Sequence, residues 1–166
     1  MSLPIGHFDG TGWAMVASGT TSSLRTVFGI DANNVWAAGL SGQILKWDGT
    51  AWSAAISGTT ARLNGLWGSS ATDVWAVGDS GTIARWDGTT WAAVMSGTTA
   101  NLSAISGIAA TTIWAAADNG LTLRWDGSQW NTAATGTGVP LRAVWTAAPM
   151  QVFVAGDQGV ILHRPN

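Results

Sequence analysis

Short apolar runs separated by turn-forming residues follow one another along the whole chain. In one representative stretch these runs are LNGLW (63–67), VWAVG (74–78), TIARW (82–86) and TWAAV (90–94), separated by the segments SSATD, DSG and DG. Runs of about five residues rich in Val, Ile and Trp, bounded by Gly, Ser and Asp, are typical of β-strands. We therefore predict four short strands, termed A to D in chain order, with an SGTT segment leading from strand D to the next strand A.

Two features of this pattern describe the expected sheets. Strands B and D show little alternation between apolar and polar residues, which is typical of sheets covered on both faces. The Asp-Gly pair between strands C and D predicts a tight hairpin, and a type I′ turn would need positive φ at both of its central residues.

The four-strand pattern recurs every 39 residues without insertions. The expected repeat units are 7–45, 46–84, 85–123 and 124–162, within a single domain that spans residues 1–166. The Asp-Gly pairs that mark the period are Asp9-Gly10, Asp48-Gly49, Asp87-Gly88 and Asp126-Gly127. Four-stranded antiparallel units at this period predict an all-β fold, a β-propeller with four blades in the chain.

The two ends of the chain are out of register with the blades. The segment HFDGTGWAMV, which contains Trp13, is predicted to be a strand D with no strand before it, whereas the last unit supplies strands A to C and no strand D. Because proteins avoid open sheet edges, we expect the N-terminal strand to complete the last blade, a Velcro closure.

Two rings satisfy this closure. One chain can close as a four-bladed ring, or two chains can exchange strands in a homodimer that forms an eight-bladed ring. We favour the homodimer, because a four-bladed ring must turn each sheet by about twice the angle. A chain that starts and stops within a blade also has the form of a fragment, or of an engineered segment, that assembles into a complete ring.

Composition excludes several classes of function. Charged residues make up 10% of the chain and the net charge is −2, with no basic stripe, so we expect no nucleic-acid partner. No apolar run approaches the roughly 20 residues that span a bilayer, so we expect no membrane partner. The N-terminal MSLPIGHF lacks the features of a signal peptide. Cysteine is absent, which removes disulfides and thiolate chemistry but leaves the compartment open.

The acidic residues favour structural roles over catalytic ones. All nine are Asp, and seven of them fall in predicted turns: Asp9, Asp48, Asp79, Asp87, Asp118, Asp126 and Asp157. Asp31 and Asp73 remain, in the loops between strands A and B. The two histidines, His7 and His163, share one repeat position and have no third ligand nearby in the pattern. We therefore predict no catalytic residue, no metal and no cofactor.

The 12 tryptophans are expected to pack between blades, and the ligand candidates lie elsewhere. Seven of them recur mid-strand in B or at the start of D: Trp36, Trp75 and Trp114, then Trp13, Trp52, Trp91 and Trp130. Positions where the repeat varies are better candidates for recognition. These are Arg25, Asn64, Ser103 and Arg142 in strand A, together with Asp31 and Asp73.

The repeat resembles two known propeller families. The Trp-Asp pairs at 47–48, 86–87 and 125–126 resemble WD repeats, although no unit carries the Gly-His dipeptide of that family. The DGTTW segment resembles the aspartate box of neuraminidase-type repeats, without the residue between Asp and Gly. The resemblance implies a propeller fold. We interpret the chain as a non-enzymatic binding or scaffold module with a protein ligand. The alternative is a lectin with one shallow glycan site per blade.

Overall fold

The computed structural model describes residues 4–8 and 10–164 and confirms an all-β, propeller-like arc. Three blades have four strands each. Blade 1 contains β3 (Leu24–Asp31), β4 (Asn34–Gly39), β5 (Ile44–Trp47) and β6 (Trp52–Ala55). Blade 2 contains β7 (Leu63–Ser70), β8 (Asp73–Gly78), β9 (Ile83–Trp86) and β10 (Trp91–Ala93). Blade 3 contains β11 (Leu102–Ala109), β12 (Thr112–Ala117), β13 (Leu121–Trp125) and β14 (Trp130–Ala134).

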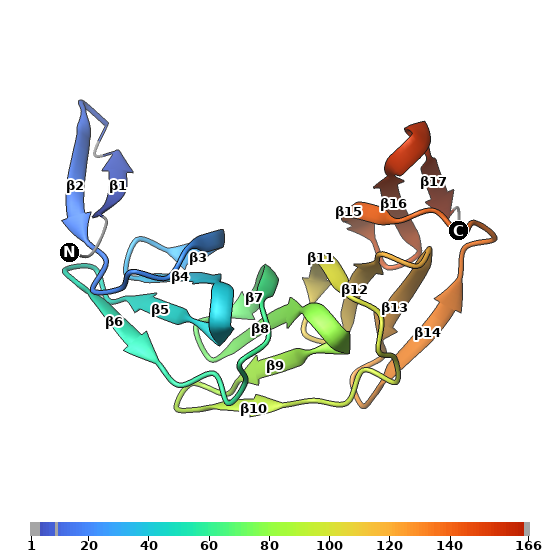
Figure 1. The fold of residues 1–166 in the computed structure, drawn as a ribbon, viewed down its shortest axis with the longest axis horizontal. Helices are drawn as coiled ribbons and strands as arrows, with labels where there is room; N and C mark the ends of the chain where they lie inside the picture. The colour runs from blue at the N-terminus through green and yellow to red at the C-terminus, as the bar shows by residue number, and fades with distance from the viewer. Residues whose placement is uncertain (1–3, 9, 165–166) are drawn as a thin grey trace.

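The remaining strands form two partial sheets at the ends of the arc. Blade 4 has three described strands, β15 (Leu141–Ala148), β16 (Gln151–Gly156) and β17 (Ile161–Arg164). The N-terminal hairpin pairs β1 (Pro4–Phe8) with β2 (Trp13–Ala17). All pairings are antiparallel between strands adjacent in the chain. In Figure 1 the A strands line the concave side of the arc, the D strands lie on its outer side, and the hairpin and blade 4 stand at opposite ends.

The N-terminal strand differs from the prediction in one respect. Trp13–Ala17 is a strand of type D, but it does not stand alone, because Pro4–Phe8 precedes it and pairs with it as a strand of type C. The sequence pattern missed this strand because Pro4 and Gly6 weaken its strand signal. Among the described strands, β1 and β17 therefore occupy the C position without belonging to a four-stranded blade.

The hairpin between strands C and D is a four-residue loop and not the predicted type I′ turn. In blade 2, Trp86 pairs with Trp91, and only Gly88 has positive φ, at 102°. The Asp87 carboxylate accepts hydrogen bonds from the amides of Thr89 and Thr90, each at 2.8 Å. Gly10, Gly49 and Gly127 have the same positive φ. Asp9 lies outside the described residues. The Asp side chain therefore closes this loop where a second residue of positive φ was expected.

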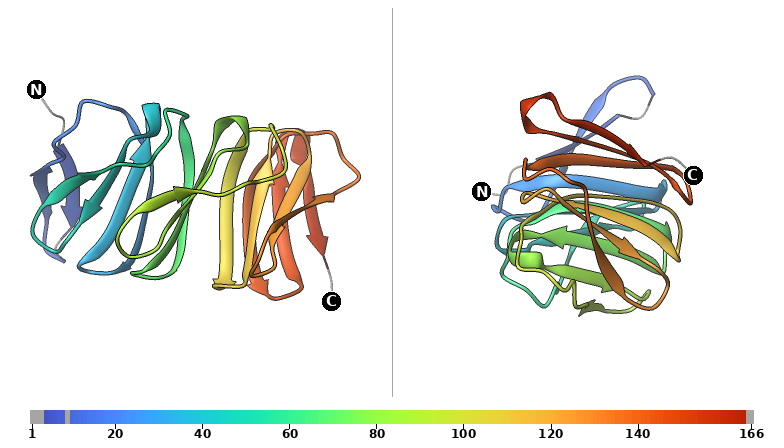
Figure 2. Two further views of the ribbon diagram at one scale, coloured as in Figure 1. Left: turned by 90° about the horizontal axis from the view of Figure 1, so that it is seen from below. Right: turned by 90° about the vertical axis from the view of Figure 1, so that its right-hand side faces the viewer.

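The core lies between neighbouring blades, which are seen as successive layers in Figure 2. The tryptophan in the middle of strand B is buried in blades 1 to 3, and it packs against the next blade along the chain. Trp75 illustrates this arrangement, since its ring lies 4.8 Å from Trp125 and 5.6 Å from Trp130 of blade 3. A continuous aromatic interface of this kind fixes each blade against its neighbour.

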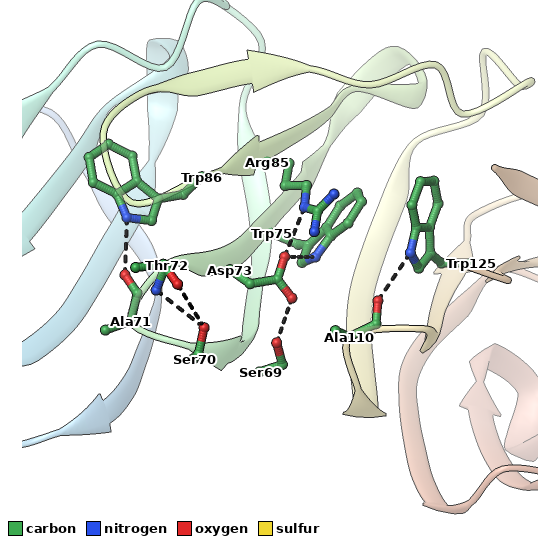
Figure 3. A network of polar contacts seen from close by, with 10 residues as sticks. All are labelled: Ser69, Ser70, Ala71, Thr72, Asp73, Trp75, Arg85, Trp86, Ala110 and Trp125. Atoms are coloured by element: carbon green, nitrogen blue, oxygen red, sulfur yellow. Dashed lines mark hydrogen bonds and ion pairs between the residues drawn. The ribbon is translucent and has the colours of Figure 1, made fainter. Parts of the chain in front are cut away.

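A second repeated contact closes each of the three four-stranded blades internally. The indole of the tryptophan that ends strand C donates a hydrogen bond of 3.1 Å to a carbonyl of the loop between strands A and B. This bond joins Trp47 to Ala32, Trp86 to Ala71 and Trp125 to Ala110. Two of the three contacts are drawn in Figure 3. Within the described chain, no helix is long and apolar enough to cross a membrane.

Candidate functional site

A polar cavity of about 300 Å³ lies on the concave side of the arc and is called the concave cavity below. Its lining includes all four variable positions of strand A, one from each blade: Arg25, Asn64, Ser103 and Arg142. The other lining residues are Arg62, Asp79, Asn101 and Asp118. The repeat thus brings together side chains that are 39 residues apart in the chain.

Backbone irregularity aims these four side chains. In every A strand the pairing with strand B shifts register twice, and the residue skipped at the first shift is the one that lines the cavity. These first shifts lie between Leu24 and Thr26, Leu63 and Gly65, Leu102 and Ala104, and Leu141 and Ala143. A β-bulge leaves one residue outside the ladder and redirects its side chain, and such bulges are frequent beside binding sites.

Hydrogen bonds across the cavity join blade 2 to blade 3. The Asn64 amide donates to the Asp79 carboxylate and to the Leu102 carbonyl, both at 2.9 Å. Asp79 also forms an ion pair of 3.0 Å with Arg62. In the next blade the Asn101 side chain donates to Asp118 at 2.7 Å. These contacts fix the positions of side chains that line the concave cavity.

The two strand-A arginines of the cavity differ in whether an acidic residue pairs with them. Arg142 donates two hydrogen bonds to Asp157, of 2.8 and 2.6 Å, which lower the pKa of that carboxyl and raise the pKa of Arg142. Arg25 occupies the equivalent position in blade 1, is exposed, and forms no ion pair with any described residue. The cavity therefore presents one guanidinium whose charge is not used within the fold.

The other two candidates, Asp31 and Asp73, do not line the concave cavity. Asp31 accepts hydrogen bonds from the Asn33 amide at 2.8 Å and from the Asn34 side chain, which lower its pKa. Asp73 is buried and accepts hydrogen bonds from the Trp75 indole at 3.1 Å and from Arg85 at 2.8 Å (Figure 3). Both residues organise their own loop and strand, and a role of either in ligand binding stays a prediction.

Sequence reasoning missed half of the residues that line the cavity. Asp79 and Asp118 were assigned only to turns, and Arg62 and Asn101 were not considered. A signal was present, because Arg62 and Asn101 occupy the same repeat position, immediately before strand A. A polar residue there faces the Asp that follows strand B in the same blade.

The Asp residues of the C–D loops in blades 1 and 2 each accept several local hydrogen bonds. The Ala51 amide and the Thr50 hydroxyl and amide lower the pKa of Asp48 to about 2. The Thr90 amide and the Thr89 hydroxyl and amide lower the pKa of Asp87 to about 2 as well. Carboxylates that are held ionised in this way do not serve as proton donors near neutral pH. In the described part of the chain, no three His, Asp or Glu side chains gather in a group that could hold a metal ion.

Comparisons with known proteins support the fold. No family model matches the chain, and no curated protein matches it. Among solved structures, YCF48 from Cyanidioschyzon merolae matches with a TM-score of 0.73 and 20% identity over 93% of this chain. A structure of YCF48 bound to a D1 peptide matches with a TM-score of 0.68 and 18% identity over 93% of this chain. The chain spans 58% and 54% of those two proteins.

A computationally designed protein, Ika4, is similar to the chain over most of both lengths. The match has a TM-score of 0.73 and 18% identity, and it covers 87% of this chain and 92% of Ika4. At these identities the likeness establishes the architecture alone: the chain folds as a partial β-propeller.

Proposed function

We propose that this chain is a non-enzymatic propeller module that binds a protein segment in the concave cavity and completes its ring by association with a second copy. The convergence of four bulged strand-A residues on one cavity is the observation that carries the binding proposal. The YCF48 structure with a D1 peptide shows that a propeller of similar fold binds a peptide. The repeats themselves we assign to the aspartate-box-like and WD-like class.

The guanidinium of Arg25, which forms no ion pair with a described residue, gives the cavity a preference for a ligand that carries a carboxylate. A guanidinium forms bidentate hydrogen bonds with a carboxylate, and such pairs are among the stronger polar contacts in proteins. Asn64 and Ser103 lie on the same row of bulges; their donors are used within the fold, so each offers its side-chain oxygen as an acceptor for backbone amides of an extended segment. We therefore assign the cavity to a segment that carries an Asp or Glu side chain or a free C-terminal carboxylate.

A peptide panel tests this assignment. Acidic peptides and their amide counterparts, with Asp and Glu replaced by Asn and Gln, would be compared by fluorescence polarisation. We expect acidic peptides to bind and Arg25→Gln to weaken binding by roughly tenfold or more, since a hydrogen bond to a charged group contributes about 1.5–3 kcal/mol. Arg124→Gln removes the same charge at a position outside the cavity and serves as the control. Equal binding of both peptide sets, or no effect of Arg25→Gln, would contradict the assignment.

The lectin alternative has no support in the structure. The tryptophans in strand B are buried between blades, so their faces are not open to a sugar ring. Trp91 and Trp130 are buried as well. Glycan binding stays a prediction from the sequence.

A further inference from the structure

One blade interface lacks half of its aromatic contacts. In the interface between blades 2 and 3, Trp75 lies against Trp125, which ends strand C, and Trp130, which begins strand D. In the interface between blades 3 and 4, the residue equivalent to Trp75 is Trp114. The position of Trp125 is taken by Arg164, whose guanidinium lies 5.3 Å from the Trp114 ring. No described residue takes the position of Trp130.

A cavity lies where that aromatic residue and its strand would be. It has a volume of about 570 Å³ and is lined by Trp114, Val152, Val154 and residues 161–164 of β17. β17 pairs with β16 on one side only in the described chain. Ile161 on this edge is 76% exposed, whereas the equivalent Ile83 is 2% exposed. The slot therefore has the shape, the apolar lining and the open strand edge that a strand D requires.

The N-terminal hairpin has the complementary defect. It supplies a strand C and a strand D without strands A and B, and its two aromatic residues are open. Trp13 is 71% exposed, while the equivalent Trp91 is 7% exposed. Between the hairpin and blade 1 lies a second cavity of about 230 Å³, lined by Trp47 and Trp52. A strand B of a preceding blade would cover these two rings.

The exposed strand B of blade 4 suits that second cavity. Phe153 stands at the repeat position of Trp75 and is partly exposed, with the ring of His163 stacked on it at 4.3 Å. In blade 2 the equivalent pair is Trp75 with Arg85, whose guanidinium lies 4.9 Å from the Trp75 ring. Phe153 therefore presents an aromatic face with its side support already in place.

The pairing register of the two ends agrees with this fit. β2 pairs with β1 in the C–D register of the complete blades, with His7 opposite Ala14 and Phe8 opposite Trp13. Residue 163 stands at the repeat position of residue 7, so the same register would place His163 opposite Ala14. β1 and β17 are thus alternative partners for one edge of β2. β1 carries Gly6 where β17 carries Leu162, and glycine weakens a strand.

We propose that β2 leaves β1 and pairs with β17 of a second copy, so that Trp13 of each copy covers Trp114 of the other. Phe153 of the second copy then packs on Trp47 and Trp52. The inference rests on the proposed self-association and specifies its joint. Within one copy, β2 and β17 lie at opposite ends of the arc, so joining them would require repacking every blade interface between them (Figure 1). Two copies related by a two-fold axis make both joints without such repacking.

A disulfide trap tests the register directly, because the chain has no native cysteine. Ala14→Cys and His163→Cys would be made as separate chains and mixed under mild oxidation. Directly opposed residues in paired strands have Cβ atoms close enough for a disulfide after small adjustment. We expect a covalent heterodimer in the mixture, visible on a non-reducing gel, and much less product from either variant alone. A double variant that forms only an internal disulfide, or a mixture that forms none, would overturn the exchange.

A second variant distinguishes strand exchange through β2 from self-association through another surface. Trp13→Ala is expected to weaken the dimer by roughly 30-fold or more, the effect of truncating an aromatic residue at the centre of an interface. Met95→Ala removes another exposed apolar side chain, in the segment that follows β10 of blade 2, and should leave the association unchanged. A dimer that persists in Trp13→Ala and yields no mixed disulfide would leave self-association intact and overturn the strand exchange.

Discussion

At the scale of single residues, the fold depends on positions that favour glycine over any residue with a Cβ atom. Gly81 has φ of +69°, and a Cβ atom placed there would lie 1.9 Å from the Thr98 carbonyl oxygen. Gly97 has a similar φ of +74° but open space around it. The first glycine serves both conformation and close packing of two segments, whereas the second serves conformation alone.

This pair separates the two costs of replacing a glycine. We expect Gly97→Ala to destabilise the protein by about 1–2 kcal/mol, the cost of a left-handed backbone for a residue with a Cβ. Gly81→Ala should cost about 3 kcal/mol or more, because the backbone contact must also open. Urea denaturation measures both. Equal losses in the two variants would contradict the close contact.

The C–D loops should make the stability of the folded protein depend on pH in the acidic range. Backbone and hydroxyl hydrogen bonds lower the pKa of Asp87 to about 2, from an ordinary value of 3.8. A lowered pKa in the folded state means that these bonds stabilise the fold above about pH 4 and are lost as the pH falls towards 2. We expect the melting temperature to decrease as the pH is lowered from about 4 to about 2. Asp87→Asn keeps an oxygen acceptor and does not titrate, so it should reduce this dependence. An unchanged pH profile in this variant would argue against the loop as its source.

At the scale of the element, blade 2 is a sheet with a buried polar anchor. Asp73 begins β8 and accepts hydrogen bonds from the Trp75 indole and from Arg85. The network fixes the indole that packs on blade 3, so a polar contact within one blade determines the aromatic contact with the next. Figure 3 shows the two hydrogen bonds that Asp73 accepts from Trp75 and Arg85.

Removing this anchor should be costly. Asp73→Ala leaves the Trp75 indole nitrogen without its acceptor and Arg85 without its ion-pair partner, and we expect a loss of about 2–3 kcal/mol in the free energy of unfolding. Thr112→Ala is the matched control, because Thr112 occupies the same repeat position and makes none of these bonds; it should change stability by less than about 0.5 kcal/mol. Equal effects of both variants in urea denaturation would contradict the anchoring role.

The same scale shows what the sequence could and could not predict. The strands and their order follow from apolar runs and turn residues, and Leu63, Val74, Ile83 and Trp91 each lie at or next to the start of an observed strand. Strand A extends to Ser70, beyond its apolar run, because backbone pairing with β8 continues where side-chain pattern ends. Bulges leave no such pattern. The variable positions were found from the repeat, but their common orientation towards one cavity depends on backbone register.

At the scale of the whole molecule, the chain is an arc whose two ends are unlike in sequence and complementary in form. At one end no described strand D covers Trp114, and the other end offers Trp13 on a strand D that pairs only with β1 among the described strands. Exposed aromatic residues at both ends, together with an open strand edge, are unfavourable for an isolated monomer. The proposed association of two copies would relieve both defects through the same contact, used twice.

The mass of the 166-residue chain in solution tests this account most directly. Sedimentation velocity over a range of micromolar concentrations would resolve the species present. We predict a single main species of twice the 17.1 kDa chain mass. A species of 17.1 kDa alone, at every concentration, would contradict it.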